Sequence, residues 1–152
     1  MVVVDIQEMK ENRDVAGLLK ACQRRDLDIE LDAIAALNEI APEVFTELIT
    51  YAETGKQLQV TAISILGMTK EPRAIPPLAG VLRNGRDFLV RKAAARALGK
   101  MNGAAVINAL GKALYDENPE VQREVVIALN HLGWQPTTAA EKKHVKEIIR
   151  RM

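Results

Sequence analysis

An apolar pattern that recurs four times constrains the fold of this chain more than any other feature. The pattern begins at Ile29, Leu58, Val90 and Val121, in steps of 29, 32 and 31 residues. Counted from these positions, offsets four, seven, eight and eleven are apolar in every copy, with Thr69 the single exception at offset eleven. These offsets lie on one stripe of an α-helix. The sequence therefore predicts four similar amphipathic helices, which is typical of a repeat protein.

Each of these helices is preceded by a second apolar segment. We call each copy of the pattern a frame. A leucine stands ten to twelve residues before the first position of every frame, flanked by apolar residues at helical spacing: Leu19, Leu48, Leu78 and Leu110. Asp or Asn precedes several of the expected helices, and Gly55 and Gly85 follow two of them, as N-caps and C-terminal stops do. The repeating unit is thus a helical hairpin of about 30 residues with a first helix, A, and a second helix, B.

A hairpin of this size cannot bury its own apolar face, so neighbouring hairpins must stack. The predicted fold is an all-α solenoid forming a single domain over residues 1–152. Its parts are an N-terminal cap (1–13), four repeats (14–41, 42–70, 71–101 and 102–134) and a C-terminal cap helix (135–152). Trp134 and Pro136 stand at the last joint and are interpreted as a packing anchor and a turn.

Composition limits where such a chain works. Cys22 is the one cysteine, so no intrachain disulfide can form, and this fits a reducing compartment. Apolar runs are far shorter than the roughly 20 residues that cross a bilayer, and Asp5 interrupts the N-terminal run too early for a signal peptide. We expect a cytoplasmic protein with no membrane association.

Residues suited to catalysis are few. The chain has two histidines, His131 and His144, one cysteine and one serine, Ser64, and no His/Cys spacing typical of zinc ligands. No glycine-rich phosphate loop follows a strand pattern. Cys22 lies on the apolar side of an expected A helix and is interpreted as a small buried hydrophobe, with a reactive thiol as the alternative. The sequence predicts a protein that is not an enzyme and has no cofactor or metal.

One stretch carries a family resemblance. Residues 87–99, DFLVRKAAARALG, closely resemble the B helix of short HEAT-like repeats of the phycobilisome-lyase type, and residues 73–78, RAIPPL, resemble the opening of the matching A helix. The first, second and fourth frames lack the Val-Arg pair of Val90-Arg91 and have Ile29-Glu30, Leu58-Gln59 and Val121-Gln122 instead. The resemblance implies a solenoid that serves as a protein-binding scaffold or adaptor, with the B helices on its concave face.

Helical geometry then indicates which B-helix residues point outward. Offsets two and six lie opposite the core stripe. Together with Arg91 at the flank, they give the predicted partner-binding residues: Leu31, Val60, Arg91, Lys92, Arg96, Arg123 and Ile127. Exposed Leu31 and Val60 suggest an apolar contact patch. The alternative is that residues 1–4 fold back and cover both side chains.

Charge is distributed unevenly, and this bears on the partner. Residues 1–76 contain 8 Lys/Arg and 13 Asp/Glu, whereas residues 77–152 contain 13 Lys/Arg and 7 Asp/Glu. We expect a protein partner with an acidic flank that meets the basic half, and self-association stays open. One alternative is nucleic-acid binding by the basic half, against which stand a pI of about 7.9 and no aromatic residue on the outward face. Another is a bilin-lyase-like enzyme, suggested only by the family resemblance.

Overall fold

The computed structural model describes residues 3–152, and the regular structure in this range is entirely helical. Ten α-helices and two short 3₁₀ helices follow one another there, with no β-strand. The chain divides into two compact units, Met1–Thr69 and Lys70–Met152, called unit 1 and unit 2 below. The all-α prediction is confirmed.

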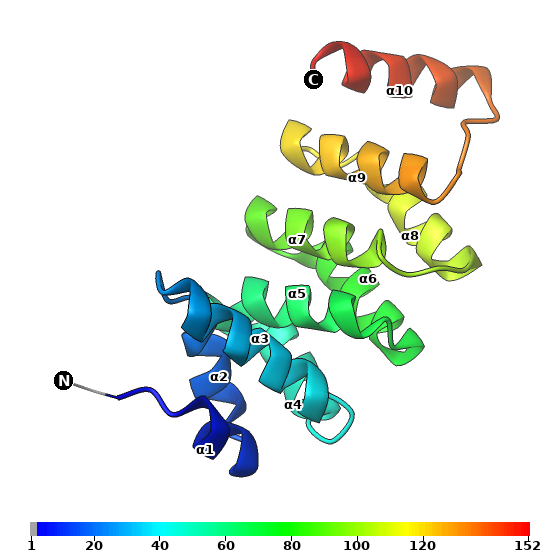
Figure 1. Cartoon of the computed structure of the whole chain (residues 1–152). Helices are drawn as coiled ribbons and strands as arrows, with labels where there is room; N and C mark the ends of the chain where they lie inside the picture. The colour runs from blue at the N-terminus through cyan, green and yellow to red at the C-terminus, as the bar shows by residue number, and fades with distance from the viewer. Residues whose placement is uncertain (1–2) are drawn as a thin grey trace. The chain divides into compact units, whose positions relative to one another are not determined.

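Unit 1 contains two helical hairpins. The short α1 packs against the first hairpin, α2 with α3, and the B helix of the second hairpin, α5, packs against α3 (Figure 1). A 3₁₀ turn, η1, leads into α5, so Leu58 lies just before the α-helix that its frame was expected to open. The elements are α1 (Ile6–Glu11), α2 (Val15–Ala21), α3 (Leu27–Ile40), α4 (Phe45–Thr54), η1 (Lys56–Leu58) and α5 (Gln59–Thr69).

Unit 2 also contains two hairpins, followed by one more helix. The B helices α7 and α9 pack side by side, the A helices α6 and α8 do the same, and α10 packs on α9 (Figure 1). The elements are η2 (Pro72–Ala74), α6 (Ile75–Asn84), α7 (Phe88–Leu98), α8 (Ala104–Ala113), α9 (Pro119–His131) and α10 (Ala139–Arg150).

The helix boundaries follow from local chemistry that the sequence already contains. Asp14, Asp26, Asp87 and Asn118 each accept a hydrogen bond from a backbone N–H in the first turn of the helix that follows. Such N-caps satisfy donors that have no partner within the helix. Thr138 and Glu141 form a reciprocal capping box at the start of α10. These contacts set where the helices begin before any tertiary packing is considered.

The predicted leucines of both helices of each hairpin lie in the core. The leucines at offset eight are at most 1% exposed, and the four A-helix leucines are completely buried: Leu37, Leu66, Leu98 and Leu129, then Leu19, Leu48, Leu78 and Leu110. Each buried leucine stabilises the fold by roughly 1.5–3 kcal/mol relative to an exposed one. Trp134, which the sequence predicts to be a packing anchor, is half-buried.

Candidate functional site

Arg91 lies in the interior of unit 2. Its guanidinium donates to both carboxylate oxygens of Asp116, from Nε at 2.8 Å and from Nη2 at 3.0 Å, and Nη1 donates to the carbonyl of Gly85 at 2.8 Å. Both charged side chains are at least nine-tenths buried. The hydrogen bonds that Arg91 donates to Asp116 raise the pKa of Arg91 further above its already high value. Arg91 therefore joins the α6–α7 turn to the α8–α9 turn and is not available to a partner.

In the second, third and fourth frames, the residue one position after the start donates to a backbone carbonyl of its own hairpin. Gln59 donates to the carbonyl of Ala52 at 2.9 Å, and Gln122 donates to the carbonyl of Asp116 at 2.8 Å, just as Arg91 donates to Gly85. Each donor satisfies a carbonyl at or just beyond the end of its own A helix. The glutamines thus reproduce one half of the arginine's contacts and omit the ion pair to the next hairpin.

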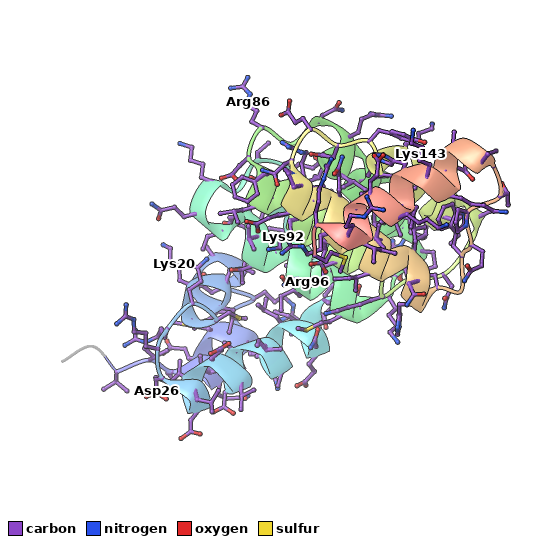
Figure 2. All side chains as sticks on the ribbon, turned by 90° about the horizontal axis from the view of Figure 1, so that it is seen from above. Lys20, Asp26, Arg86, Lys92, Arg96 and Lys143 are labelled. Atoms are coloured by element: carbon purple, nitrogen blue, oxygen red, sulfur yellow. The ribbon has the colours of Figure 1, made fainter. Side chains whose placement is uncertain are left out.

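Lys92 and Arg96 are exposed or half-exposed, and both are paired. Lys92 Nζ lies 2.8 Å from Glu120, and Arg96 makes two hydrogen bonds of 3.0 Å to Glu124. Figure 2 shows both cations close together on one side of unit 2. The Lys92 hydrogen bond and charge lower the pKa of Glu120, and Glu124 raises the pKa of Arg96. These pairs connect α7 to α9 and neutralise part of the predicted basic surface.

Arg123 and Ile127 occupy the same outward offsets on α9. Arg123 makes no direct ion pair with a described residue, although its charge helps to lower the pKa of Glu120, and Ile127 stays exposed. Arg123 is exposed and belongs to none of the ion pairs within residues 3–152. Ile127 is 47% exposed, which is high for an isoleucine on a packed helix. The outward face of α9 therefore combines an unpaired cation with an exposed apolar side chain one turn further along.

In unit 1, Leu31 on α3 and Val60 on α5 are 55% and 40% exposed. Val3 is itself 82% exposed and Val4 is half-buried, while Met1 and Val2 lie outside the described residues. The helix α1 packs against α3 nearer its C-terminal end, where Lys10 forms an ion pair of 2.7 Å with Glu39. Within the described part of the chain, Leu31 and Val60 remain open to solvent.

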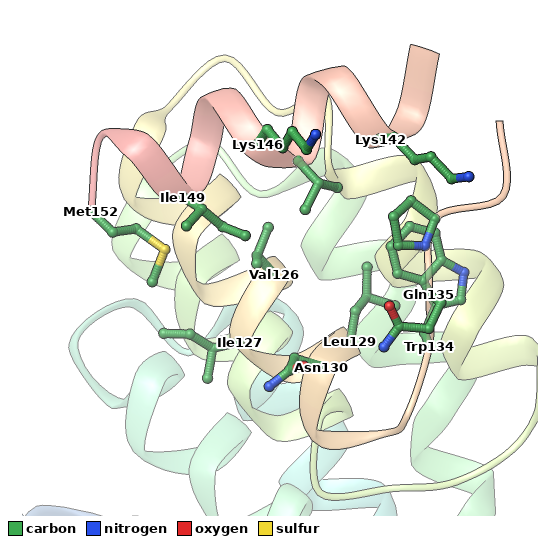
Figure 3. A pocket seen from close by; sticks show the side chains of 12 residues that line it. Val126, Ile127, Leu129, Asn130, Trp134, Gln135, Lys142, Lys146, Ile149 and Met152 are labelled. Carbon is green, nitrogen blue, oxygen red and sulfur yellow. The ribbon is translucent and has the colours of Figure 1, made fainter. Parts of the chain in front are cut away.

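A cleft of about 480 Å³ lies between α9 and α10 (Figure 3). Ile127, Ile149 and Met152 gather at one end of it, and Trp134 and Lys142 lie at the other. Its volume falls in the range of about 300–1,000 Å³ that is usual for binding sites. The lining residues are Val126, Ile127, Leu129, Asn130, Trp134, Gln135, Pro136, Lys142, Val145, Lys146, Ile149 and Met152. The cleft has an apolar interior with lysines at its border.

The residues considered for catalysis lie in separate places. Burial, and secondarily the charge of Glu30, raises the pKa of Cys22 to about 11, which keeps the half-buried thiol protonated. His144 Nε2 lies 2.6 Å from the carbonyl oxygen of Leu114, and its ring stacks on Tyr115 with centroids 4.5 Å apart. Among residues 3–152, no group of three or more His, Cys, Asp or Glu side chains is arranged to hold a metal ion. In the same range, no helix is both long and apolar enough to cross a membrane.

Sequence reasoning missed the cleft, although one signal for it was present. The sequence predicts α10 only as a cap helix, and the predicted site residues do not include Lys142, Lys146, Ile149 and Met152. Its apolar residues Val145, Ile148 and Ile149 do share one face, but Val145 and Ile148 are buried whereas Ile149 is 53% exposed. That difference depends on how far α10 extends over α9, which the spacing does not encode.

The fold defines a class of protein: an array of helical hairpins that presents side chains on its outward helix faces. Comparison with known proteins identifies the family. The model for HEAT repeats matches residues 15–99, 42–130 and 81–150. The chain belongs to the HEAT repeat family, and the predicted α-solenoid class is confirmed with it.

The chain is also similar to part of an epoxyqueuosine reductase of Bacillus anthracis. The two are 43% identical over 65 residues, which amount to 43% of this chain and 17% of that reductase. The match thus covers less than a fifth of the reductase.

Proposed function

We propose that this chain is a non-catalytic scaffold or adaptor that binds a partner protein through the outward faces of its B helices. The observation that carries this proposal is the face of α9, where exposed Ile127 lines the apolar cleft beneath α10 and exposed Arg123 stands one turn before it. Exposed apolar groups beside a cleft are typical of protein interaction sites. Leu31 and Val60 provide a second candidate patch, in unit 1.

Of the other predicted contact residues, Lys92 and Arg96 can contribute only at the edge of such a surface. Each is already paired with a glutamate of α9, and breaking that pair would offset part of any gain from a new contact. Arg91 supports the site from inside the unit, since it is buried with Asp116.

The same ion pairs favour a protein partner over a nucleic acid. A phosphate backbone is bound by cations that are free to replace its counterions. Two cations of the basic half, Lys92 and Arg96, have carboxylates within 3.0 Å, so that face of α7 carries little net positive charge. The remaining exposed cation on the B helices of unit 2, Arg123, stands beside Ile127, which suits a protein side chain better than a phosphate.

A non-catalytic role is supported by the chemistry of the titratable groups. The raised pKa of Cys22 opposes formation of a nucleophilic thiolate at neutral pH. One ring nitrogen of His144 is occupied by the Leu114 carbonyl.

The proposal is tested by affinity purification from a lysate of the source organism, with half of each sample treated with nuclease. The test variant is Arg123→Glu/Ile127→Asp, and the matched control is Arg86→Glu/Leu89→Asp, whose exposed residues lie outside the cleft. We expect one or more nuclease-resistant proteins that are retained by the control and lost by the test variant. Identical capture by both variants would refute the proposal, and capture dependent on nucleic acid would favour the rival function.

A further inference from the structure

The charge around the cleft between α9 and α10 is of one sign. Lys142 and Lys146 stand one turn apart on α10, both are exposed, and neither forms an ion pair within residues 3–152. None of the residues that line the cleft is acidic. Arg123 adds a further unpaired cation one turn before Ile127 on α9. The charged side chains that line the apolar interior are therefore all positive.

The repeat itself indicates what such a face of a B helix contacts. On α7, offsets five, six and nine are Ala95, Arg96 and Gly99, and this face packs against α9. Ala95 is fully buried, Arg96 is bonded to Glu124, and a Cβ atom on Gly99 would lie 2.8 Å from the Cβ of Ala128. This face of α7 is thus where the next B helix docks.

The equivalent face of α9 has no B helix against it among the described residues. Its offsets five, six and nine are Val126, Ile127 and Asn130, and all three line the cleft. The helix α10 packs on α9 but leaves Ile127 47% exposed and its own Ile149 53% exposed. The cleft is therefore a helix-docking face that is only partly covered.

We propose that this cleft binds an acidic amphipathic α-helix of a partner protein, which packs on α9 as α9 packs on α7. The inference rests on the proposed scaffold function and specifies the kind of partner. An amphipathic helix laid into an apolar groove is a recurrent mode of recognition, in which a few apolar anchors supply most of the affinity. Here the lysines select acidic residues on the rim of that helix.

The register of α9 on α7 predicts the pattern of the partner helix. In the existing pair, Glu120, Glu124 and Ala128 of α9 meet Lys92, Arg96 and Gly99 of α7. A helix in the equivalent position on α9 therefore needs a carboxylate against Arg123 and, four residues later, an apolar side chain against Ile127. The cleft extends along α10 from Lys142 to Met152, which at 1.5 Å per residue corresponds to a partner helix of about three turns.

The same charges argue against a second copy of this chain as the occupant. The helix α10 with its last two residues carries Lys142, Lys143, Lys146, Arg150 and Arg151 but only two acids, Glu141 and Glu147. Two copies that met through their clefts would bring these cations together, and like charges in an interface are unfavourable.

The test uses a synthetic peptide copied from residues 117–133 of this chain, with Glu124→Leu and with Asn130→Glu and His131→Glu, so that carboxylates also lie towards the Lys142 end of the cleft. This peptide keeps Glu120 to meet Arg123 and places a leucine against Ile127. Its binding to the full chain is measured by fluorescence anisotropy at low and high salt. The control peptide keeps Glu124, which would lie against Ile127.

We expect saturable binding of the Glu124→Leu peptide, at least tenfold tighter than that of the control peptide and weaker at high salt. Ile127→Asp should reduce the affinity at least tenfold. Lys142→Glu/Lys146→Glu should reduce it similarly and remove most of the salt dependence. The matched variant Lys143→Glu/Arg150→Glu makes the same charge change on α10 at exposed residues outside the cleft, and it should bind like the wild type. Circular dichroism of each variant verifies that it is folded.

Three outcomes would overturn the inference. These are no saturable binding up to about 1 mM peptide, equal binding by the wild type and the folded Lys142→Glu/Lys146→Glu variant, and a wild-type dimer that Ile127→Asp dissociates. The two proposals can fail separately. If the peptide fails but a cellular protein is still lost with Arg123→Glu/Ile127→Asp, the scaffold function stands and the acidic helix is wrong. If the peptide binds as expected and no cellular protein depends on these residues, the scaffold function is wrong.

Discussion

The B helices α3 and α5 of unit 1 share an apolar frame with α7 and α9 of unit 2, yet different side chains join the two pairs. In unit 2, three cations of α7 reach acids that lie on α9 or just before it: Arg91 to Asp116, Lys92 to Glu120 and Arg96 to Glu124. In unit 1, the positions equivalent to Lys92 and Arg96 are Leu31 and Ala35, and the acids are replaced by Gln57 and Thr61. A weak contact from Asn38 to Met68 is among the few polar contacts between α3 and α5. The frame thus specifies a stack of helices, whereas the outward offsets decide whether the stack is joined by charge.

Breaking the buried ion pair of unit 2 should have the largest effect. Arg91→Ala leaves the Asp116 carboxylate buried without its cation, which costs about 3–5 kcal/mol of unfolding free energy. Urea denaturation measures the loss. Gln59→Ala is the comparison in unit 1, because Gln59 makes only the local bonds to Ala52 and Glu53, and it should cost about 1 kcal/mol. If both variants lose the same unfolding free energy, the ion pair adds nothing to the local hydrogen bond that Arg91 and Gln59 have in common.

The close approach of α7 and α9 provides the next test. Gly99→Val places a branched side chain where even a Cβ would lie 2.8 Å from the Cβ of Ala128, so we expect about 1–3 kcal/mol of destabilisation. The control is Gly111→Ala on α8, where a Cβ meets nothing within 4 Å. That change should stabilise the protein by about 0.5–1 kcal/mol. Thermal unfolding measures the change in stability of both variants. If Gly99→Val leaves the stability unchanged, α7 and α9 are not packed as tightly as described.

A third test introduces the equivalent of the Lys92–Glu120 pair into unit 1. Leu31→Lys with Gln57→Glu reproduces the offsets of Lys92 and Glu120 on α3 and before α5. We expect a coupling of about 0.2–1 kcal/mol between the two changes in a double-mutant cycle, reduced at high salt. A coupling of zero would mean that α3 and α5 do not share the register of α7 and α9.

The native pair should also respond to pH. Lys92 lowers the pKa of Glu120 in the folded protein. The Lys92–Glu120 pair therefore contributes fully to stability when the pH is above the pKa of an ordinary glutamate. The contribution is lost as the pH falls through the lowered value. Lys92→Met should remove this part of the acid sensitivity, as measured by unfolding at a series of pH values.

The last prediction concerns the reactivity of Cys22, not stability. The quantity measured is the rate at which its thiol is alkylated. With the pKa raised to about 11 from 9.0, the thiolate fraction at pH 8 is about a hundredfold lower than for an ordinary thiol, and alkylation by iodoacetamide should be slow. The rate should increase about tenfold per pH unit up to that pKa. Replacing Glu30 by Gln removes the secondary cause and should accelerate the reaction modestly. Rapid alkylation at neutral pH would indicate an activated thiol instead.

Much of this fold could be predicted from residue spacing because helix formation and core burial repeat with a fixed period. Leu37, Leu66, Leu98 and Leu129 are buried where the frame placed them, and Asp14, Asp26, Asp87 and Asn118 cap the expected helices. The candidate site was less accessible to such reasoning. Helical offsets do identify Leu31, Val60, Arg123 and Ile127 as outward residues, and all four are exposed. The same offsets do not reveal that the neighbouring helix supplies partners for Lys92 and Arg96.

The sequence by itself determined the secondary structure, the caps and the buried stripe, since these depend on contacts within a helix and on the apolar period along it. Tertiary structure alone decided which outward side chains remain available. Arg91 is buried because the α8–α9 turn brings Asp116 to it from 25 residues away, and Ile127 is exposed because α10 covers only part of α9. Such distances depend on how one helix lies on another, and a residue's own position in its helix does not specify them.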